Sequence, residues 1–191
     1  MVVKWDLEII SNMKKLIEVL KEATGQTYEY GCVMLYFDFP EIKKIHEIID
    51  PEDIYHEEGD RSFGLEDEPH TTLLYGLHDG VTSKDIEGVL EQFKFGTCSI
   101  KNASLFDNPQ YDVLKFDVSG PGLHESNKEL TDFPHTTSFP DYHPHLTIGY
   151  LKSGTGKKYT EKLKGVSYSL TPKYAVYSKP DGGQDKLKIN V

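Results

Sequence analysis

The chain has 191 residues, a formal net charge of −10 at pH 7 and a sequence pI of about 5.2. This length fits one globular domain. Such an acidic chain is poorly suited to long nucleic acids, whose backbones are bound by clustered Lys and Arg. The sequence has no apolar run of membrane-spanning length and no N-terminal pattern of a secretion signal. We therefore expect a soluble cytoplasmic protein, in the host cytoplasm if the source is viral, with a small substrate.

Residues 1–27 are predicted to form an N-terminal amphipathic helix or extension. Their apolar residues have helical spacing and the pattern ends at Gly25, after Trp5, Ile9, Leu16, Ile17 and Leu20. This segment either packs on the domain, binds a partner or is the tail of a longer chain. Residues 28–191 are predicted to form a single domain.

The first half of this domain begins with an aromatic strand over 28–39 and a short helix over 41–49. An acidic loop over 57–68 leads into a strand over 69–77. A helix is expected over 82–93, with Thr82 as its N-cap. Strands over 98–106 and 111–118 are predicted to form a hairpin around the turn residues 107–109.

The second half repeats this order. A helix over 123–130 precedes a loop and a strand that ends at Leu151. A short helix near 159–163 and strands near 166–177 and 186–191 complete the chain. The pattern predicts the α+β class, with two similar lobes and mostly antiparallel sheets.

Two copies of a short motif dominate the sequence: Pro69-His70-Thr71-Thr72-Leu73 and Pro144-His145-Leu146-Thr147-Ile148. In a strand, residues two apart point to the same face, so each copy presents an imidazole beside a hydroxyl. Two imidazoles that titrate near neutral pH, with hydroxyls able to hold an anion, indicate acid–base chemistry at a phosphate.

With the two motif histidines 75 residues apart (145 minus 70), the chain resembles the 2H phosphoesterase superfamily, named for paired His-x-Thr/Ser motifs. The superfamily includes 2′-5′ RNA ligase-like proteins, cyclic phosphodiesterases and the phage anti-CBASS nucleases that degrade cyclic-oligonucleotide immune signals. The resemblance implies a bilobal, pseudo-symmetric fold in which two mostly antiparallel sheets face a central groove, with helices outside. It also implies a metal-independent phosphodiesterase without a cofactor, whose catalytic residues are His70, Thr72, His145 and Thr147.

In this interpretation one histidine is the general base, the other is the general acid, and the threonines bind the phosphate oxygens. The sequence does not assign the two histidine roles. The substrates implied are 2′,3′-cyclic phosphates, 2′-5′ linkages and cyclic oligonucleotide second messengers, with short RNA ends as further partners. Two alternatives stay open: a module that sequesters a nucleotide or RNA end without turnover, and a 2′-5′ RNA ligase.

Three further residues are predicted to bind substrate. Arg61, the only arginine, precedes the first motif, and a guanidinium can hold a phosphate at two points. Its alternative role is an ion pair within the acidic loop. Tyr142 and His143 directly precede the second motif and are expected at the edge of the site.

Two other histidine patterns lie near the second motif. Pro134-His135-Thr136-Thr137 repeats the letters of the first motif, but the polar residues and proline that follow indicate a loop. His143 and His145 with Asp141 have the spacing of a metal site. That site would leave the first motif unexplained, so we expect no metal.

Other residues with reactive or aromatic side chains are assigned structural roles. Strict alternation along the two motif strands predicts that Tyr75 and Tyr150 face away from the groove. Cys32 and Cys98 are expected to be small buried thiols. The remaining histidines are also interpreted as structural: His46, His56, His78 and His124.

Overall fold

The structure is a computed structural model that describes residues 29–58, 60, 63–137 and 141–191. The predicted N-terminal helix and Arg61 lie outside the described residues. Within the described ranges, no helix is long and apolar enough to cross a membrane.

The part of the chain that the structure describes has the predicted α+β composition. The strands are β1 (Gly31–Phe37), β2 (His70–Leu77), β3 (Cys98–Asp107), β4 (Tyr111–Ser119), β5 (His145–Lys152), β6 (Ser167–Leu170), β7 (Pro172–Ser178) and β8 (Gln184–Leu187). The helices are α2 (Ile42–His46), α3 (Ser83–Leu90), α4 (Leu123–Leu130) and α5 (Lys157–Lys162), with a 3-10 turn, η1, at Pro51–Asp53.

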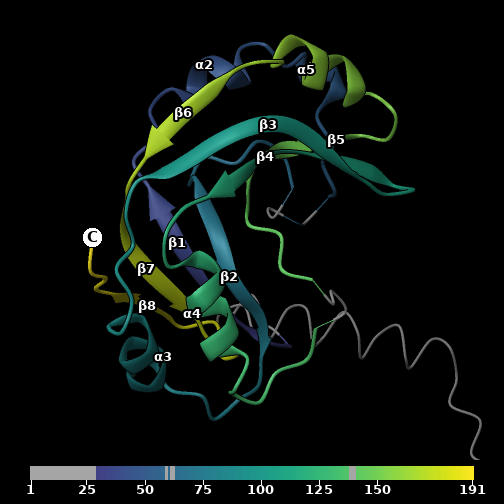
Figure 1. The fold of residues 1–191 in the computed structure, drawn as a ribbon. Helices are drawn as coiled ribbons and strands as arrows, with labels where there is room; N and C mark the ends of the chain where they lie inside the picture. The colour runs from purple at the N-terminus through teal and green to yellow at the C-terminus, as the bar shows by residue number, and fades with distance from the viewer. Residues whose placement is uncertain (1–28, 59, 61–62, 138–140) are drawn as a thin grey trace, which may run out of the picture.

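All eight strands belong to one curled antiparallel sheet, in the order β6-β3-β4-β5-β2-β1-β7-β8 (Figure 1). The prediction of two facing sheets is therefore wrong. Thr71 of β2 pairs with Leu146 of β5 and joins two four-stranded halves. The physical reason is that two separate sheets would leave the edges of β2 and β5 with unpaired backbone groups, which this pairing satisfies.

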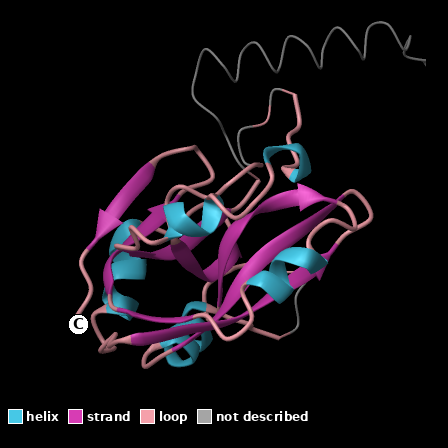
Figure 2. Ribbon diagram, turned by 90° about the horizontal axis from the view of Figure 1, so that it is seen from above, coloured by secondary structure: helices cyan, strands magenta, loops and turns pink. Residues whose placement is uncertain are grey.

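The two halves are interlocked through their helices. Helix α2 follows β1 in the chain but packs against β5, and α4 follows β4 but packs against β2. Figure 1 shows α2 and α5 together at one end of the sheet and α3 and α4 at the other. Figure 2 shows the sheet and its helices from above. The core residues under these helices are fully buried: Leu73, Leu77, Leu146 and Ile148.

Most element boundaries agree with the predictions from sequence. Thr82 caps α3 through a capping box with Asp85. The segment predicted near 166–177 divides into β6 and β7, because the chain changes partner strand from β3 to β1. The last strand ends at Leu187, and beyond it Asn190 forms an isolated bridge with Lys94 and donates from Nδ2 to the Glu91 carbonyl at 2.8 Å.

Gly76 lets a distant loop pack against the end of β2. Its φ is +104°, and a Cβ there would lie 1.9 Å from the carbonyl oxygen of Thr136. The backbone N–H of Thr136 donates to the Gly76 carbonyl at 2.9 Å, and His135 bridges to Leu77. The loop interpretation of His135 is therefore correct, although the loop is anchored to the first motif strand.

We expect Gly76→Ala to lower the free energy of unfolding by about 1–3 kcal/mol from backbone strain, with a further loss from displacing the loop. Gly80→Ala is the matched control, because Gly80 also has positive φ (+95°) but nothing within 4 Å of its Cβ position. Denaturant unfolding of both variants measures the difference. Equal destabilisation would show that the loop contact contributes nothing.

Candidate active site

The two motifs meet where β2 and β5 pair. Thr71 lies opposite Leu146, and both side chains are completely buried. Continuing this antiparallel register by one residue in each direction sets His70 opposite Thr147 and Thr72 opposite His145. The two histidines then lie on a diagonal, about 7–8 Å apart in a regular sheet and somewhat less at Cβ. We call the sheet face that carries these four residues the motif face.

Each catalytic candidate histidine is oriented by its own chain. Nδ1 of His70 lies 2.8 Å from the carbonyl oxygen of Glu68, and Nδ1 of His145 lies 2.9 Å from that of His143. A carbonyl only accepts, so Nδ1 carries the proton in both rings. In the neutral form Nε2 is therefore the free acceptor, and in the cationic form it is a donor. Both rings can act as base or acid through the same atom.

A β-bulge follows each His-x-Thr motif. Thr72 and Leu74 pair with the consecutive residues Met34 and Val33, so Leu73 is an extra residue in β2. Thr147 and Gly149 likewise pair with consecutive residues of β4, so Ile148 is the extra residue in β5. A bulge leaves backbone groups outside the ladder, and these must find other partners.

The covering helices supply those partners. Nδ2 of Asn127, in α4, donates to the Leu73 carbonyl at 2.6 Å. Nε2 of His46, in α2, lies 3.2 Å from the Ile148 carbonyl, which also accepts from the backbone N–H of Glu66 at 3.0 Å. The structural interpretation of His46 is thus supported, and both motif strands are held in the same way.

The bulges reverse the orientation predicted for Tyr75 and Tyr150. Cys32, Met34 and Tyr36 alternate on one face of β1; Tyr36 pairs with His70, and Cys32 pairs with Tyr75. Tyr75 therefore shares the motif face and is 51% exposed. Tyr150 pairs with Val113, two residues before Lys115, which pairs with Thr147. The prediction that these tyrosines face away is wrong, because each bulge adds one residue and shifts the alternation.

The surroundings of the two histidines differ in charge. The His70 ring stacks on Tyr36 with centroids 5.3 Å apart, and its Nδ1 lies 3.9 Å from a carboxylate oxygen of Glu66. His145 meets Phe106 edge to face at 4.9 Å. The strand beside His145 carries a lysine, Lys115. His70 is thus near an anion, while the strand beside His145 carries both a cation, Lys115, and an anion, Asp117.

Lys115 is a buried cation on the motif face, with only 6% of its surface exposed. Its Nζ donates to Ser104 Oγ and to Asp117 Oδ1, both at 2.9 Å, and lies 4.5 Å from the centroid of Phe106. In the β4–β5 register, Lys115 pairs with Thr147 and Asp117 pairs with His145. The ion pair therefore adjoins both residues of the second motif.

Burial lowers the pKa of His145 below its ordinary value. The hydrogen bond to the His143 carbonyl and the charge of Asp117 oppose this shift, while Lys115 and His70 lower the pKa further. His145 is accordingly neutral over more of the physiological pH range than an exposed histidine.

A cavity of about 200 Å³ adjoins the His70 side of the site. Its lining combines aromatic, charged and amide groups: Tyr36, Glu68, Tyr174, Val176, Gln184 and Lys186. The rings of Tyr36 and Tyr174 are nearly parallel, 5.3 Å apart, and Lys186 Nζ lies 3.5 Å from the Tyr174 centroid. Pockets that enclose a whole drug-sized ligand measure about 300–1,000 Å³, so this cavity fits one part of a ligand.

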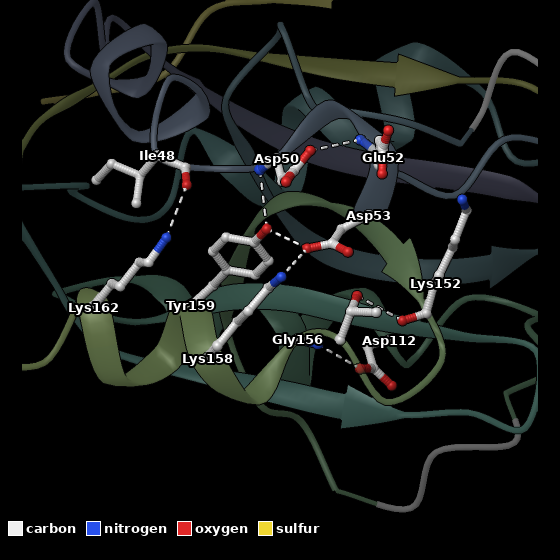
Figure 3. Close-up of polar contacts among 11 residues, drawn as sticks. Ile48, Asp50, Glu52, Asp53, Asp112, Lys152, Gly156, Lys158, Tyr159 and Lys162 are labelled. Carbon is white, nitrogen blue, oxygen red and sulfur yellow. Dashed lines mark hydrogen bonds and ion pairs between the residues drawn. The ribbon is translucent and has the colours of Figure 1, made fainter.

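A larger hollow of about 520 Å³ lies beside α5 and contains no histidine. Its carboxylate, Asp112, already accepts from the backbone N–H of Gly156 at 2.8 Å. Nearby, Lys158 pairs with Asp53 at 2.5 Å, and the Tyr159 hydroxyl donates to Asp53 (Figure 3). These groups attach α5 to η1 and to β4, which is a structural role.

The predicted substrate-binding residues have different surroundings. The Tyr142 hydroxyl donates to the Thr72 carbonyl at 3.0 Å and so supports the first motif directly. His143 is exposed, and its carbonyl holds His145. Contact of Tyr142, His143 or Arg61 with substrate stays a prediction.

The alternative metal site has no geometric support. Across residues 29–58, 60, 63–137 and 141–191, no three His, Cys, Asp or Glu side chains converge to hold a metal ion. Cys32 and Cys98 are free, and burial raises their pKa values to about 12 and about 11. These thiols are therefore protonated at neutral pH and unsuited to nucleophilic chemistry.

Comparison with known proteins gives a likeness of structure. Kluyveromyces marxianus Usb1, solved with uridine monophosphate, matches with a TM-score of 0.50 and 10% identity, over 84% of this chain and 98% of that one. A protein described as a phosphoesterase matches with a TM-score of 0.46 and 14% identity, over 84% and 99% of the two chains. No family model matches, and neither does any curated protein sequence. The similarity to Usb1 is one of fold, and it agrees with the fold class that the motif resemblance implies.

Sequence reasoning missed several residues around the site. Lys115 and Asp117 are two apart in β4, so alternation alone places both on one face. Their pairing with the second motif needs the β4–β5 register, which the sequence does not give. Tyr36, Tyr174 and Lys186 come from three further strands, and no local pattern links them.

We expect Asn127→Ala to lower the free energy of unfolding by about 1–3 kcal/mol, because it leaves the bulge carbonyl of Leu73 without its partner. Lys128→Ala, at the next position of α4 and exposed, is the control and should have little effect. Amide hydrogen exchange around Leu73 checks the mechanism. Unchanged protection there would mean that the side chain does not hold the bulge.

Proposed function

We propose that this protein is a metal-independent phosphodiesterase that cleaves small nucleotides with His70, Thr72, His145 and Thr147. The observation that supports the proposal is the pairing of Thr71 with Leu146 at the β2–β5 seam, because this register, continued by one residue each way, would set both motifs on one face. Usb1 and its uridine monophosphate support a nucleotide phosphate as the ligand class, at the level of a similar fold.

The reaction needs one proton acceptor and one donor. The neutral histidine takes the proton of the attacking hydroxyl or water, and the cationic histidine gives a proton to the departing ribose oxygen. The two threonine hydroxyls donate to the non-bridging phosphate oxygens, where charge develops in the transition state. Both protons pass through Nε2, because Nδ1 is occupied by a backbone carbonyl in each ring.

The substrates proposed are 2′,3′-cyclic phosphates, 2′-5′ linkages and cyclic oligonucleotide messengers. The net charge of −10 disfavours long polyanions. In a cyclic oligonucleotide, an internal 2′-hydroxyl would attack the adjacent phosphate, so a 2′-deoxy analogue should resist cleavage. Degradation of such messengers is the form in which the activity would serve a phage against cyclic-nucleotide immunity.

The cavity beside His70 suits the base of such a nucleotide. Glu68, whose backbone carbonyl holds His70, is also one of the residues that line the cavity. A carboxylate only accepts and an ammonium only donates. Guanine offers two adjacent N–H donors on one edge and two acceptors, O6 and N7, on another, which matches Glu68 and Lys186.

Catalysis should depend on both histidines. We expect His70→Ala and His145→Ala each to lower kcat/KM by about 10²–10⁴-fold, and Thr72→Val or Thr147→Val to lower kcat by about 10²–10³-fold. Product chromatography with a chelator present, across 2′,3′-cyclic mononucleotides, a 2′-5′ dinucleotide and cyclic di- and trinucleotides, makes the measurement. His135→Ala is the control, because His135 has the same local sequence and the same Nδ1 contact, to the Phe133 carbonyl at 2.9 Å.

The alternatives predict other outcomes. Nucleotide binding without turnover of any substrate favours the sequestering module. Joining of 2′ and 5′ ends by the same residues favours the ligase. Activity that disappears with chelator and returns with a divalent ion contradicts the metal-independent mechanism.

The preference for one nucleobase over the others tests whether the cavity binds the base of the substrate. We expect guanine-containing substrates to have the highest kcat/KM, and Glu68→Gln to reduce that preference by about tenfold or more, because it replaces an acceptor-only group. Asp67→Asn is the matched control: it removes the same charge one residue away, outside the cavity lining. An unchanged ratio among the four bases in Glu68→Gln would exclude this side chain from base recognition.

A further inference from the structure

The second motif adjoins a partly buried ion pair, Lys115–Asp117. The side chains that adjoin His145 come from three strands. They are Lys115 and Asp117 on β4, Phe106 on β3, and His70 on β2. Around His70 the charged groups are Glu66, at 3.9 Å, Glu68, whose carbonyl accepts its Nδ1–H, and Lys186, across the adjoining cavity. The cation that the strand register sets directly beside a motif is Lys115, next to the second motif.

On energetic grounds, the Lys115–Asp117 pair is a poor stabilising interaction. Removing an ammonium from water costs several kcal/mol, and an ion pair recovers that cost only with good additional hydrogen bonds. Lys115 has 8% of its side chain exposed and Asp117 has 49%, so the pair is buried at one end only. An apolar side chain at position 115 would pack against Phe106 without that cost. A role in the site accounts for the cation.

The geometry points to Lys115 as a positioning residue that acts through His145, making His145 the general base and His70 the general acid. A fixed positive charge beside His145 favours its neutral form, which is the form that accepts a proton. Asp117 holds Lys115 in place and partly offsets its charge. The two motifs are nearly symmetric in the sheet, and this charge fixes which histidine accepts a proton and which donates one. This inference rests on the proposed function, since it assigns roles within that reaction.

The inference predicts opposite effects for the two members of the pair. Lys115→Met removes a cation, so the acid limb of the pH profile of kcat/KM should move to higher pH by about 0.5–1 unit. At pH values well below this limb, the shift corresponds to a loss of about three- to tenfold in kcat/KM. Asp117→Asn removes an anion, so the limb should move to lower pH. Lys115→Arg keeps the charge and should restore the original position of the limb.

The control is Lys152→Met. It makes the same change of charge at the exposed far end of β5, the strand that carries His145. It should leave the limb in place. A pH-independent loss of activity in Lys115→Met, or a shift of the same sign in Asp117→Asn, would overturn the inference.

An NMR titration of the His145 ring separates this inference from the proposed function. The midpoint for His145 should rise in Lys115→Met and fall in Asp117→Asn, whether or not the protein turns over a substrate. If the midpoints move as expected but no nucleotide is cleaved, the electrostatic coupling stands and the phosphodiesterase proposal fails. If cleavage is seen but the midpoints do not move, the role of Lys115 is wrong and the function stands.

Discussion

The bulge that follows each His-x-Thr motif is the constraint on which the rest of the structure depends. It releases the carbonyl of Leu73 or Ile148 from the sheet ladder. Asn127 and His46 then bind these carbonyls from the helices above. Because α4 lies over β2 and α2 lies over β5, each half of the chain secures the motif strand of the other. The two histidines are thus held in one frame by contacts that cross between the halves.

On this shared backbone the two halves place different charges. Glu66 and Glu68 precede His70, while Lys115 adjoins His145. A symmetric pair of imidazoles would have no preferred direction of proton transfer, since each could be acid or base. Unequal neighbours remove that equivalence without altering the geometry. The aromatic residue on each histidine also differs, with Tyr36 stacked on His70 and Phe106 edge-on to His145.

The local structure could be predicted from the sequence much further than the assembly. Helix α4 and the β3–β4 hairpin follow from periodicity and turn chemistry, and the four motif residues follow from a duplicated pattern. The single sheet could not be predicted, because only Thr71 and Leu146 join its halves. The predicted orientation of Tyr75 is wrong for a similar reason. A bulge depends on hydrogen bonds from distant helices, and strand alternation alone does not reveal it. Lys115 was missed because its relation to His145 exists only across two strands.

His135 shows why the motif letters alone do not define a site. Its Nδ1 lies 2.9 Å from the carbonyl two residues before it, as in His70 and His145. The sequence Pro-His therefore gives the same ring orientation in all three places. His135, however, forms only an isolated bridge to Leu77, beyond the bulge of β2, and has no second motif across from it. What distinguishes His70 and His145 is the pairing of their strands, which sets a hydroxyl opposite each imidazole. Acid–base chemistry at a phosphate needs that pairing, since neither motif alone supplies both the donor and the acceptor.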